Sequence, residues 1–322
     1  KEKHYYSDPF LLNLQGLLYE QSGDWNNAFI AYRNAADVYI KAGGSYYGVE
    51  VPDQLKQDLL HSAHQVGFTD IENEYASLLK TNKKIRVDSA GSLVLFIEQG
   101  RSPVKEQFVY NIINDGMNRP MYYTDAFGNQ VNFNFNHREH GVSDQKITNI
   151  RTIRVALPIY KPITLNRASC TVIANKNPIN IEPVQDFNTL AVSVLQDRFL
   201  NELIKAVARF LIKSAITTGI EKGAESAGKN KADKETDPEK KKQKEENAKN
   251  TAKAIGFLLN TAAAVSEQAD TRSWLSLPAF ISYVRIPLVP GNNQIEISAG
   301  GQNKTISVNG KPGLQITSVS LP

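Results

Sequence analysis

Two pairs of histidines are spaced as metal ligands often are. His137 and His140 lie three residues apart in NHREHG, and His61 and His64 lie three apart in a stretch of helical periodicity. Two imidazoles are too few for a zinc site, and the order differs from the HExxH helix of metalloproteases. A polar turn explains the first pair and one face of a solvated helix explains the second. We therefore predict no metal site.

Other reactive side chains are not arranged for catalysis either. Cys170, the only cysteine, lies in the alternating run CTVIA and is interpreted as a small core residue. The sequence has neither a GxSxG elbow nor a glycine-rich loop followed by lysine and a hydroxyl residue. GKPG near residue 312 is typical of a β-turn. We therefore expect no catalytic residue, no cofactor and no enzyme activity.

Charge is nearly balanced except in one segment. The 322 residues carry 37 Lys and Arg against 33 Asp and Glu, a formal charge of +4. Residues 222–253 hold ten lysines and seven acidic residues, which predicts a solvated tip between two helices. Contact of this tip with an anionic membrane surface is the alternative. The even balance elsewhere excludes a generic nucleic-acid binder, so no nucleic acid is expected as a partner.

Residues 9–80 have the periodicity of helices. Apolar residues recur at helical spacing in LLNLQGLL, SGDW interrupts them, and AFIAYRNAADVY resumes them, which predicts an antiparallel helix pair. Small residues suit a close crossing of two helices, and aromatic residues fill the space around it. The residues predicted to make this packing are Gly16, Tyr19, Trp25, Ala28, Tyr32 and Ala35.

The first helix pair resembles a tetratricopeptide repeat. GLLYEQSGDWNNAFIAYRNA places its small and aromatic residues in the spacing of that family. A second pair follows, with Pro52 opening one helix and Asp70 preceding the next, but its small and aromatic residues depart from the pattern. We predict one repeat and one degenerate repeat in residues 1–85 rather than an extended array.

From residue 92 the apolar pattern alternates as it does in strands. SLVLFIEQG, YYTDAFGNQVNFNF, IRTIRVALP and CTVIA precede Asp186, whereas FISYVRIPL, NQIEISA, KTISVN and LQITSVSL follow residue 279. We predict that both groups close one β-sandwich, in preference to two separate sheets. This hypothesis fails if the two groups share no contacts.

A long helical hairpin is predicted between the two groups of strands. From Phe187 to Ala215 an apolar residue recurs at every fourth position, which marks a face in need of a partner. The nearest candidate is AKAIGFLLNTAAAVSEQAD, whose longest uncharged run is too short to span a bilayer. The predicted fold class is therefore α+β. Its helical domain covers residues 1–85, and its β-sandwich domain covers 86–322 with the hairpin inserted at about 186–269.

The segment DTRSWLSLPAFISYVRIPLVPG indicates a rigid corner. Asp270 and Arg272 can form a charge-assisted pair, Trp274 offers a large anchor, and Pro278 stops a helix before a strand. The segment also resembles the signature of an uncharacterised family of envelope lipoproteins from Gram-negative, Bacteroidetes-like bacteria, which have tetratricopeptide-like amino-terminal helices. LVLFIEQGRSPVKE, ALPIY and AVARFLIK agree with that family as well.

This resemblance implies a location and a role rather than a reaction. It implies an outer-membrane or periplasmic lipoprotein that is lipid-anchored upstream of residue 1, with other small envelope lipoproteins as partners. We therefore expect a noncatalytic scaffold for protein interactions. Some of its tyrosines either anchor a partner or cap the repeat core, namely Tyr5, Tyr6, Tyr46 and Tyr47. The alternative function is a module that binds or hydrolyses envelope glycans, which requires two carboxylates in a cleft. The sequence nominates no such pair.

Overall fold

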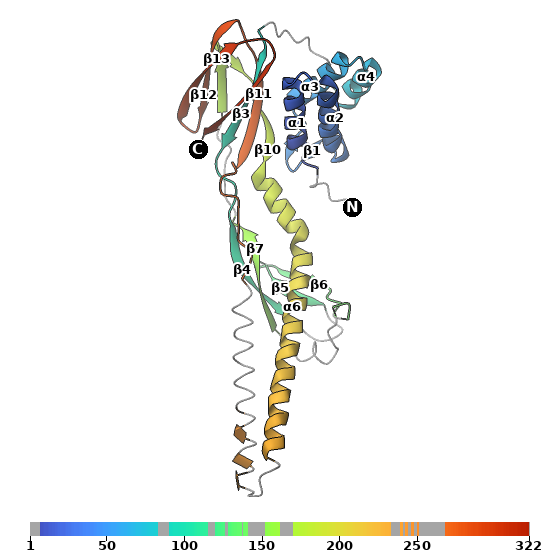
Figure 1. The fold of residues 1–322 in the computed structure, drawn as a ribbon, viewed down its shortest axis with the longest axis vertical. Coiled ribbons are helices and arrows are strands. Elements are labelled where there is room, and N and C mark those ends of the chain that lie inside the picture. Colours follow the sequence, from blue (N-terminus) through green and yellow to red (C-terminus); the bar gives the residue numbers. More distant parts are fainter. Residues whose placement is uncertain are drawn as a thin grey trace. The chain divides into compact units, whose positions relative to one another are not determined.

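The computed structural model has a mixed α+β fold with several sheets, in agreement with the predicted class (Figure 1). It describes residues 7–82, 90–114, 120–125, 128–136, 138–140, 152–161, 170–232, 239–240, 242–243, 246–247, 250 and 268–321. The chain divides into two compact units. One comprises residues 1–104, 162–194 and 273–322, and the other comprises 105–161 and 195–272. This division differs from the expected boundary at residue 85, because the amino-terminal helices share a core with strands from distant parts of the chain.

The first unit begins with two helix pairs, as predicted. Its helices are α1 (Pro9–Gln21), α2 (Trp25–Lys41), α3 (Asp53–Gln65) and α4 (Thr69–Leu78), and between the pairs lie β1 (Ser45–Tyr46) and β2 (Val49–Glu50). The side chain of Asp8 accepts a hydrogen bond from the backbone N–H of Phe10, and Asp24 accepts one from Asn27. These two carboxylates cap the amino-terminal ends of α1 and α2.

Helices α1 and α2 approach each other closely at Gly16. A Cβ placed on Gly16 would lie 2.4 Å from two atoms of the Tyr32 ring. Tyr32, Ala28 and Ala35 are fully buried in α2. The small residues thus lie where the sequence pattern predicted a close crossing, and Tyr32 covers it.

We expect Gly16→Ala to lower the free energy of unfolding by about 1–2 kcal/mol. Alanine favours a helix over glycine by about 0.5–1 kcal/mol, but overpacking a buried site costs about 1–3 kcal/mol and outweighs that gain. Denaturant unfolding measures the difference, with Gln15→Ala at the exposed neighbouring position as the control. A more stable Gly16→Ala protein would show that the Tyr32 ring can move aside.

Two four-stranded sheets follow in the first unit. One has the order β10-β11-β3-β14 and the other β13-β12-β8-β9. Strand β14 runs parallel to β3, and the other pairings in these sheets are antiparallel. Strands from before Asp186 therefore pair with strands from after residue 279, as the insertion hypothesis requires. Their bounds are β3 (Ser92–Gln99), β8 (Cys170–Ala174), β9 (Asn177–Ile179), β10 (Glu182–Asp186), β11 (Phe280–Pro287), β12 (Gly291–Ala299), β13 (Gln302–Gly310) and β14 (Leu314–Leu321).

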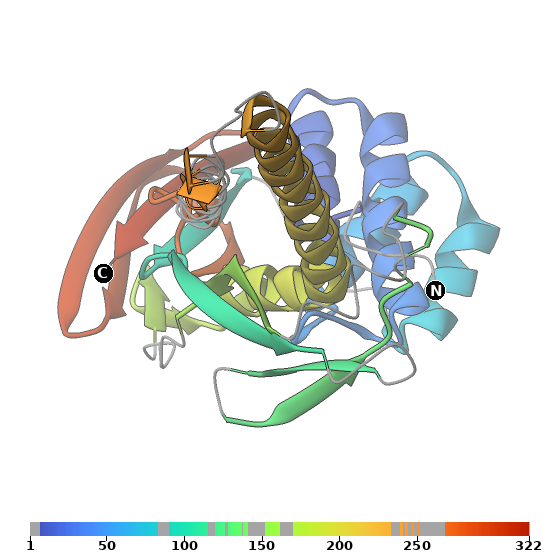
Figure 2. The ribbon, with the colours of Figure 1, turned by 90° about the horizontal axis from the view of Figure 1, so that it is seen from below.

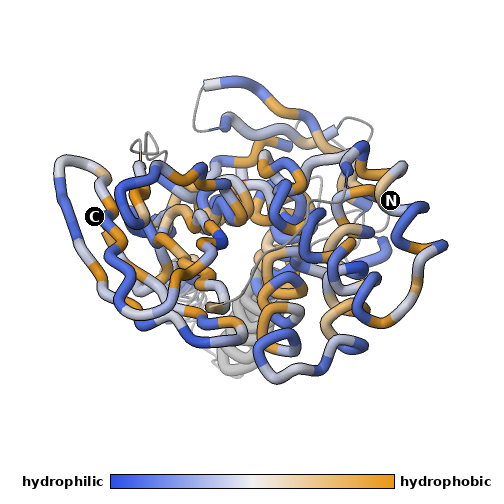
Figure 3. Tube along the Cα trace, turned by 90° about the horizontal axis from the view of Figure 1, so that it is seen from above, coloured by the Kyte–Doolittle hydropathy of each residue, from blue (hydrophilic) through white to orange (hydrophobic). Residues whose placement is uncertain are grey.

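Strand β3 is buried on both faces. Val94 and Phe96 belong to the hydrophobic cluster shared with α1–α4, whereas Leu93, Leu95 and Ile97 belong to the cluster shared with the second sheet. Because side chains alternate along a strand, the two clusters lie on opposite faces of the first sheet. This explains why β3 has a continuous apolar run. The strands nearest the label C in Figure 3 instead alternate between hydrophilic and hydrophobic residues.

The second unit has a sheet of its own, of order β6-β5-β4-β7. Its strands are β4 (Lys105–Ile113), β5 (Met121–Thr124), β6 (Gln130–Phe133) and β7 (Thr152–Tyr160), with β5 and β6 in the predicted hairpin (Figure 2, green). The prediction that all early strands join the late ones is therefore wrong for β5, β6 and β7, and β4 was not predicted as a strand. The physical reason is that the apolar face of this sheet packs against a helix instead of against another sheet.

That helix is α6 (Phe187–Ala232), which begins in the first unit and continues into the second. Its residues Phe199, Leu203, Val207 and Leu211 pack with the apolar side chains of the β4–β7 sheet. Four residues of the predicted helical stripe are thus covered by strands. The segment predicted to cover the stripe, residues 251–267, lies outside the described residues.

Candidate interaction surfaces

A buried arginine links the helices of the first unit to its first sheet. Arg285 lies on β11 and donates hydrogen bonds to both carboxylate oxygens of Glu20 on α1, each at 2.9 Å. It also contacts Asp58 on α3 at 3.1 Å and donates to Ser92 Oγ on β3 at 3.1 Å. We call Arg285, Glu20 and Asp58 the buried ion cluster.

Further hydrogen bonds hold the carboxylates of the buried ion cluster in place. The Tyr32 hydroxyl donates to Glu20 Oε2 at 2.7 Å, and Gln54 donates to Asp58 Oδ1 at 2.8 Å. Burial raises the pKa of Tyr32 well above its usual value, and the nearby carboxylates raise it further. Burial alone would lower the pKa of Arg285, but Asp58 and Glu20 more than offset it, so the guanidinium stays charged. The cluster is therefore a structural link, and its carboxylates do not face solvent.

The residues predicted to pack the repeat fall into two groups. Gly16, Ala28, Tyr32 and Ala35 are buried together, as described above. Tyr19 and Trp25 are only half-buried. Trp25 contacts His61 edge to face, with ring centroids 5.4 Å apart, and so extends the first helix pair onto α3.

The histidines have partners that differ from metal ligands. His64 Nδ1 lies 3.1 Å from a carboxylate oxygen of Glu72, whereas the His61 ring contacts Trp25. His140 stacks on Phe135, and His137 lies outside the described residues. Within the described part of the chain, no three His, Cys, Asp or Glu side chains gather in a way that could hold a metal ion.

Two of the four tyrosines expected either to anchor a partner or to cap the repeat core lie in the described residues. Tyr46 is buried in the cluster between the helices and the first sheet, and Tyr47 is half-buried against it. Their rings meet edge to face at 4.7 Å. The short β1–β2 pair turns Tyr46 inward, which favours capping of the core over an exposed anchor for this residue. Tyr5 and Tyr6 lie outside the described residues.

The predicted corner at residues 270–278 contains the expected ion pair. The Arg272 guanidinium donates to both Asp270 carboxylate oxygens at 2.8 Å, although both side chains are exposed. Hydrogen bonds from Arg272 hold the pKa of Asp270 well below its usual range. Pro278 is half-buried just before β11. This bidentate pair fixes the local backbone but lies in solvent.

Trp274 is exposed instead of packed. It is 70% exposed, and its neighbour Leu275 is 67% exposed. The indole Nε1 donates to Ser276 Oγ, which is also exposed, at 2.6 Å. We call Trp274 and Leu275 the Trp274 surface. The sequence pattern located this tryptophan but predicted neither its exposure nor the role of Leu275.

The backbone beneath the Trp274 surface is held in a fixed turn. The carbonyl of Trp274 accepts hydrogen bonds from Ser102 Oγ at 3.0 Å and from Leu277 N–H at 3.3 Å. Ser102 N–H donates to the Leu277 carbonyl at 2.9 Å, and Ala279 N–H donates to the Gln99 carbonyl at 2.9 Å. The two large apolar side chains are therefore presented to solvent by an ordered turn, which reduces the entropy lost on binding.

No protein-family model, curated protein or solved structure matches this chain. Among the described residues, no helix has a stretch that is both long and apolar enough to cross a bilayer.

Proposed function

We propose that this chain is a noncatalytic subunit of a bacterial cell-envelope assembly and acts as a protein-interaction scaffold. The observation that carries the proposal is the Trp274 surface, on which two large apolar side chains are exposed next to each other. Tryptophan is enriched at the centres of protein interfaces, where it contributes much of the binding energy. The ordered turn beneath it is what a preformed binding site requires.

The resemblance to envelope lipoproteins supplies the rest of the proposal. We propose that the helix pairs are tetratricopeptide-like and that the two sheets of the first unit form a β-sandwich. Small lipoproteins of the outer membrane or periplasm are the proposed partners, and a lipid anchor upstream of residue 1 is the proposed attachment. Residues 222–253 add a proposed contact with anionic lipid, which their seven acidic residues weaken.

A glycan hydrolase is the alternative, and the carboxylates of the buried ion cluster are not placed to serve it. Glycoside hydrolysis uses two carboxylates that face a substrate across a cleft. Glu20 and Asp58 are two carboxylates drawn together in the first unit, but both are buried and both bind Arg285. Their position supports a role in stability rather than in acid–base chemistry.

Trp274→Ala tests the scaffold function. We expect affinity for the partner to fall about 30-fold, since loss of an interface tryptophan costs about 2 kcal/mol. The measurement is recovery of envelope proteins with the tagged chain from its native cells, quantified by mass spectrometry. Val289→Ala removes a side chain that is 52% exposed elsewhere in the same unit and serves as the control.

Thermal unfolding should be unchanged in both variants, because neither side chain is buried. If Trp274→Ala recovers the same partners in the same amounts, or if the unmodified chain recovers none, the proposal fails.

A further inference from the structure

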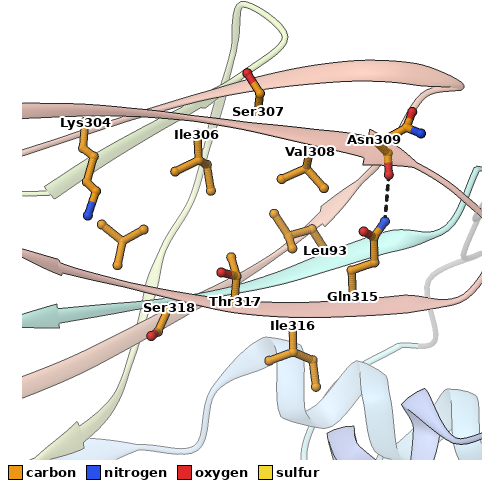
Figure 4. Close-up of a pocket in the computed structure, with 11 residues that line it drawn as sticks. Leu93, Lys304, Ile306, Ser307, Val308, Asn309, Gln315, Ile316, Thr317 and Ser318 are labelled. Atoms are coloured by element: carbon orange, nitrogen blue, oxygen red, sulfur yellow. Dashed lines mark hydrogen bonds between the residues drawn. The ribbon is translucent and has the colours of Figure 1, made fainter.

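The two sheets of the first unit leave a groove between their edge strands. Strand β14 is the last strand of one sheet, and β13 is the last strand of the other. Between them lies a groove of about 410 Å³, with Leu93 of β3 at its floor (Figure 4). We call it the edge groove. Because each wall is a strand edge, its shape suits an extended chain.

The apolar side chains of the edge groove are unevenly covered. Val319 of β14 and Leu93 of β3 are buried, whereas Ile306 and Val308 of β13 are only half-buried. Figure 4 shows Ile306 and Val308 pointing from β13 toward β14 across the groove. A further strand added to the first sheet beside β14 would lie opposite these two side chains and cover them.

The edges of β13 and β14 lack the usual protection against pairing. Edge strands are normally blunted by proline, bulges or several charges. Strand β14 (LQITSVSL) has no proline and no charge, and β13 (QNKTISVNG) carries only Lys304. Their pairing with β3 and β12 continues without a register shift. Within the described residues neither strand has a second neighbour in its sheet.

The ends of the edge groove differ in chemistry. At one end the Gln315 side chain donates to the Asn309 carbonyl at 3.0 Å and bridges the two strands. At the other end Lys304 points into the groove (Figure 4). Lys304 is the one charged side chain among the residues that line the groove. A ligand aligned along the strands would therefore place a negative charge at the Lys304 end.

We propose that an extended segment of a partner protein binds the edge groove by adding a strand to the edge of β14 beyond Leu314, whose carbonyl accepts a hydrogen bond from Gln21 on α1 at 3.4 Å. Backbone hydrogen bonds hold this strand, and its alternate apolar side chains cover Ile306 and Val308. An acidic residue of the segment pairs with Lys304. The edge groove is separate from the Trp274 surface, so this proposal stands whether or not that surface binds a partner.

Synthetic peptides test the proposal on the purified full chain. The probe is a labelled peptide as long as the eight-residue strand β14, with alternating valine and threonine and one terminal aspartate. Fluorescence anisotropy measures its affinity, and hydrogen exchange reports which strand it covers. We expect binding to slow the exchange of amides in β14, and a peptide of the same composition with its valines in one block to bind about tenfold more weakly.

Matched variants on β13 separate the groove from the opposite face of the strand. Ile306→Arg places a charge in the groove and should weaken peptide binding about tenfold or more, because an unpaired charge resists burial. Thr305→Arg adds the same charge at an exposed position on the opposite face of β13, outside the residues that line the groove, and it should leave the affinity unchanged. The peptide with a terminal aspartate should bind the unmodified chain more tightly than the same peptide with asparagine at that position. Lys304→Gln should abolish this difference in affinity.

Three results would overturn the proposal. The first is the absence of binding by any of the alternating peptides, and the second is equal loss of affinity in Ile306→Arg and Thr305→Arg. The third is concentration-dependent dimerisation of the chain that Ile306→Arg abolishes, because a second copy would then be the occupant of the edge groove.

Discussion

Arg285→Met is expected to lower the free energy of unfolding by about 3–5 kcal/mol, the largest loss we predict for a single substitution. Methionine fills much of the same volume, so the loss is chiefly electrostatic. Without the guanidinium, Glu20 and Asp58 remain buried beside each other with no cation between them. Denaturant unfolding followed by tryptophan fluorescence and by circular dichroism measures the change.

Two controls identify burial as the cause of this loss. Arg272→Met removes an arginine with the same bidentate geometry from a solvent-exposed pair, and no measurable change is expected because exposed ion pairs contribute little. Combining Arg285→Met with Glu20→Gln and Asp58→Asn removes the two orphaned charges and should recover part of the stability. A loss below about 1 kcal/mol in Arg285→Met would mean that water reaches the cluster.

Gly91→Ala is expected to destabilise the protein by about 2–5 kcal/mol. Gly91 has a φ of +79°, a conformation that costs other residues about 1–2 kcal/mol. A Cβ there would also lie 2.0 Å from the Lys311 carbonyl oxygen and 2.4 Å from that of Gly313. These are backbone atoms, so relief requires the turn before β14 to shift, with an overpacking cost of about 1–3 kcal/mol.

Gly301→Ala separates the two causes. Gly301 has nearly the same φ, +78°, but a Cβ on it would meet nothing within 4 Å. It should therefore lose only the conformational part, about 1–2 kcal/mol. Thermal and denaturant unfolding of both variants give the difference. Equal losses in the two proteins would show that the turn at Gly313 yields to the added methyl group.

Local periodicity predicted the elements well and their pairing only in part. The helices of residues 9–80 and the four strands after residue 279 follow from their apolar spacing, because each pattern is set by nearby residues. The parallel pairing of β3 with β14 joins residues more than two hundred positions apart, and no local pattern records it. Strand β4 was missed, since KEQFVYNII mixes polar and apolar residues on both faces.

The candidate sites show the same limit. Nothing in the local sequence SYVRIP indicates that Arg285 is buried. Its partners, Glu20 and Asp58, come from helices far away in the sequence. The sequence singled out Trp274 as a large aromatic residue. Whether its side chain is buried or exposed depends on the turn that Ser102 holds by a hydrogen bond to the Trp274 carbonyl. The edge groove depends on which strands end each sheet, a property of the assembled sheets alone.

The parallel pairing of β14 with β3 also bears on when this protein can fold. Strand β3 receives both of its neighbours, β11 (Phe280–Pro287) and β14 (Leu314–Leu321), from the last part of the described residues. A chain from which those strands have not yet emerged, at a ribosome or at an export channel, holds an apolar central strand with neither neighbour. Such an intermediate is prone to aggregate and gains from a chaperone until residue 321 has emerged.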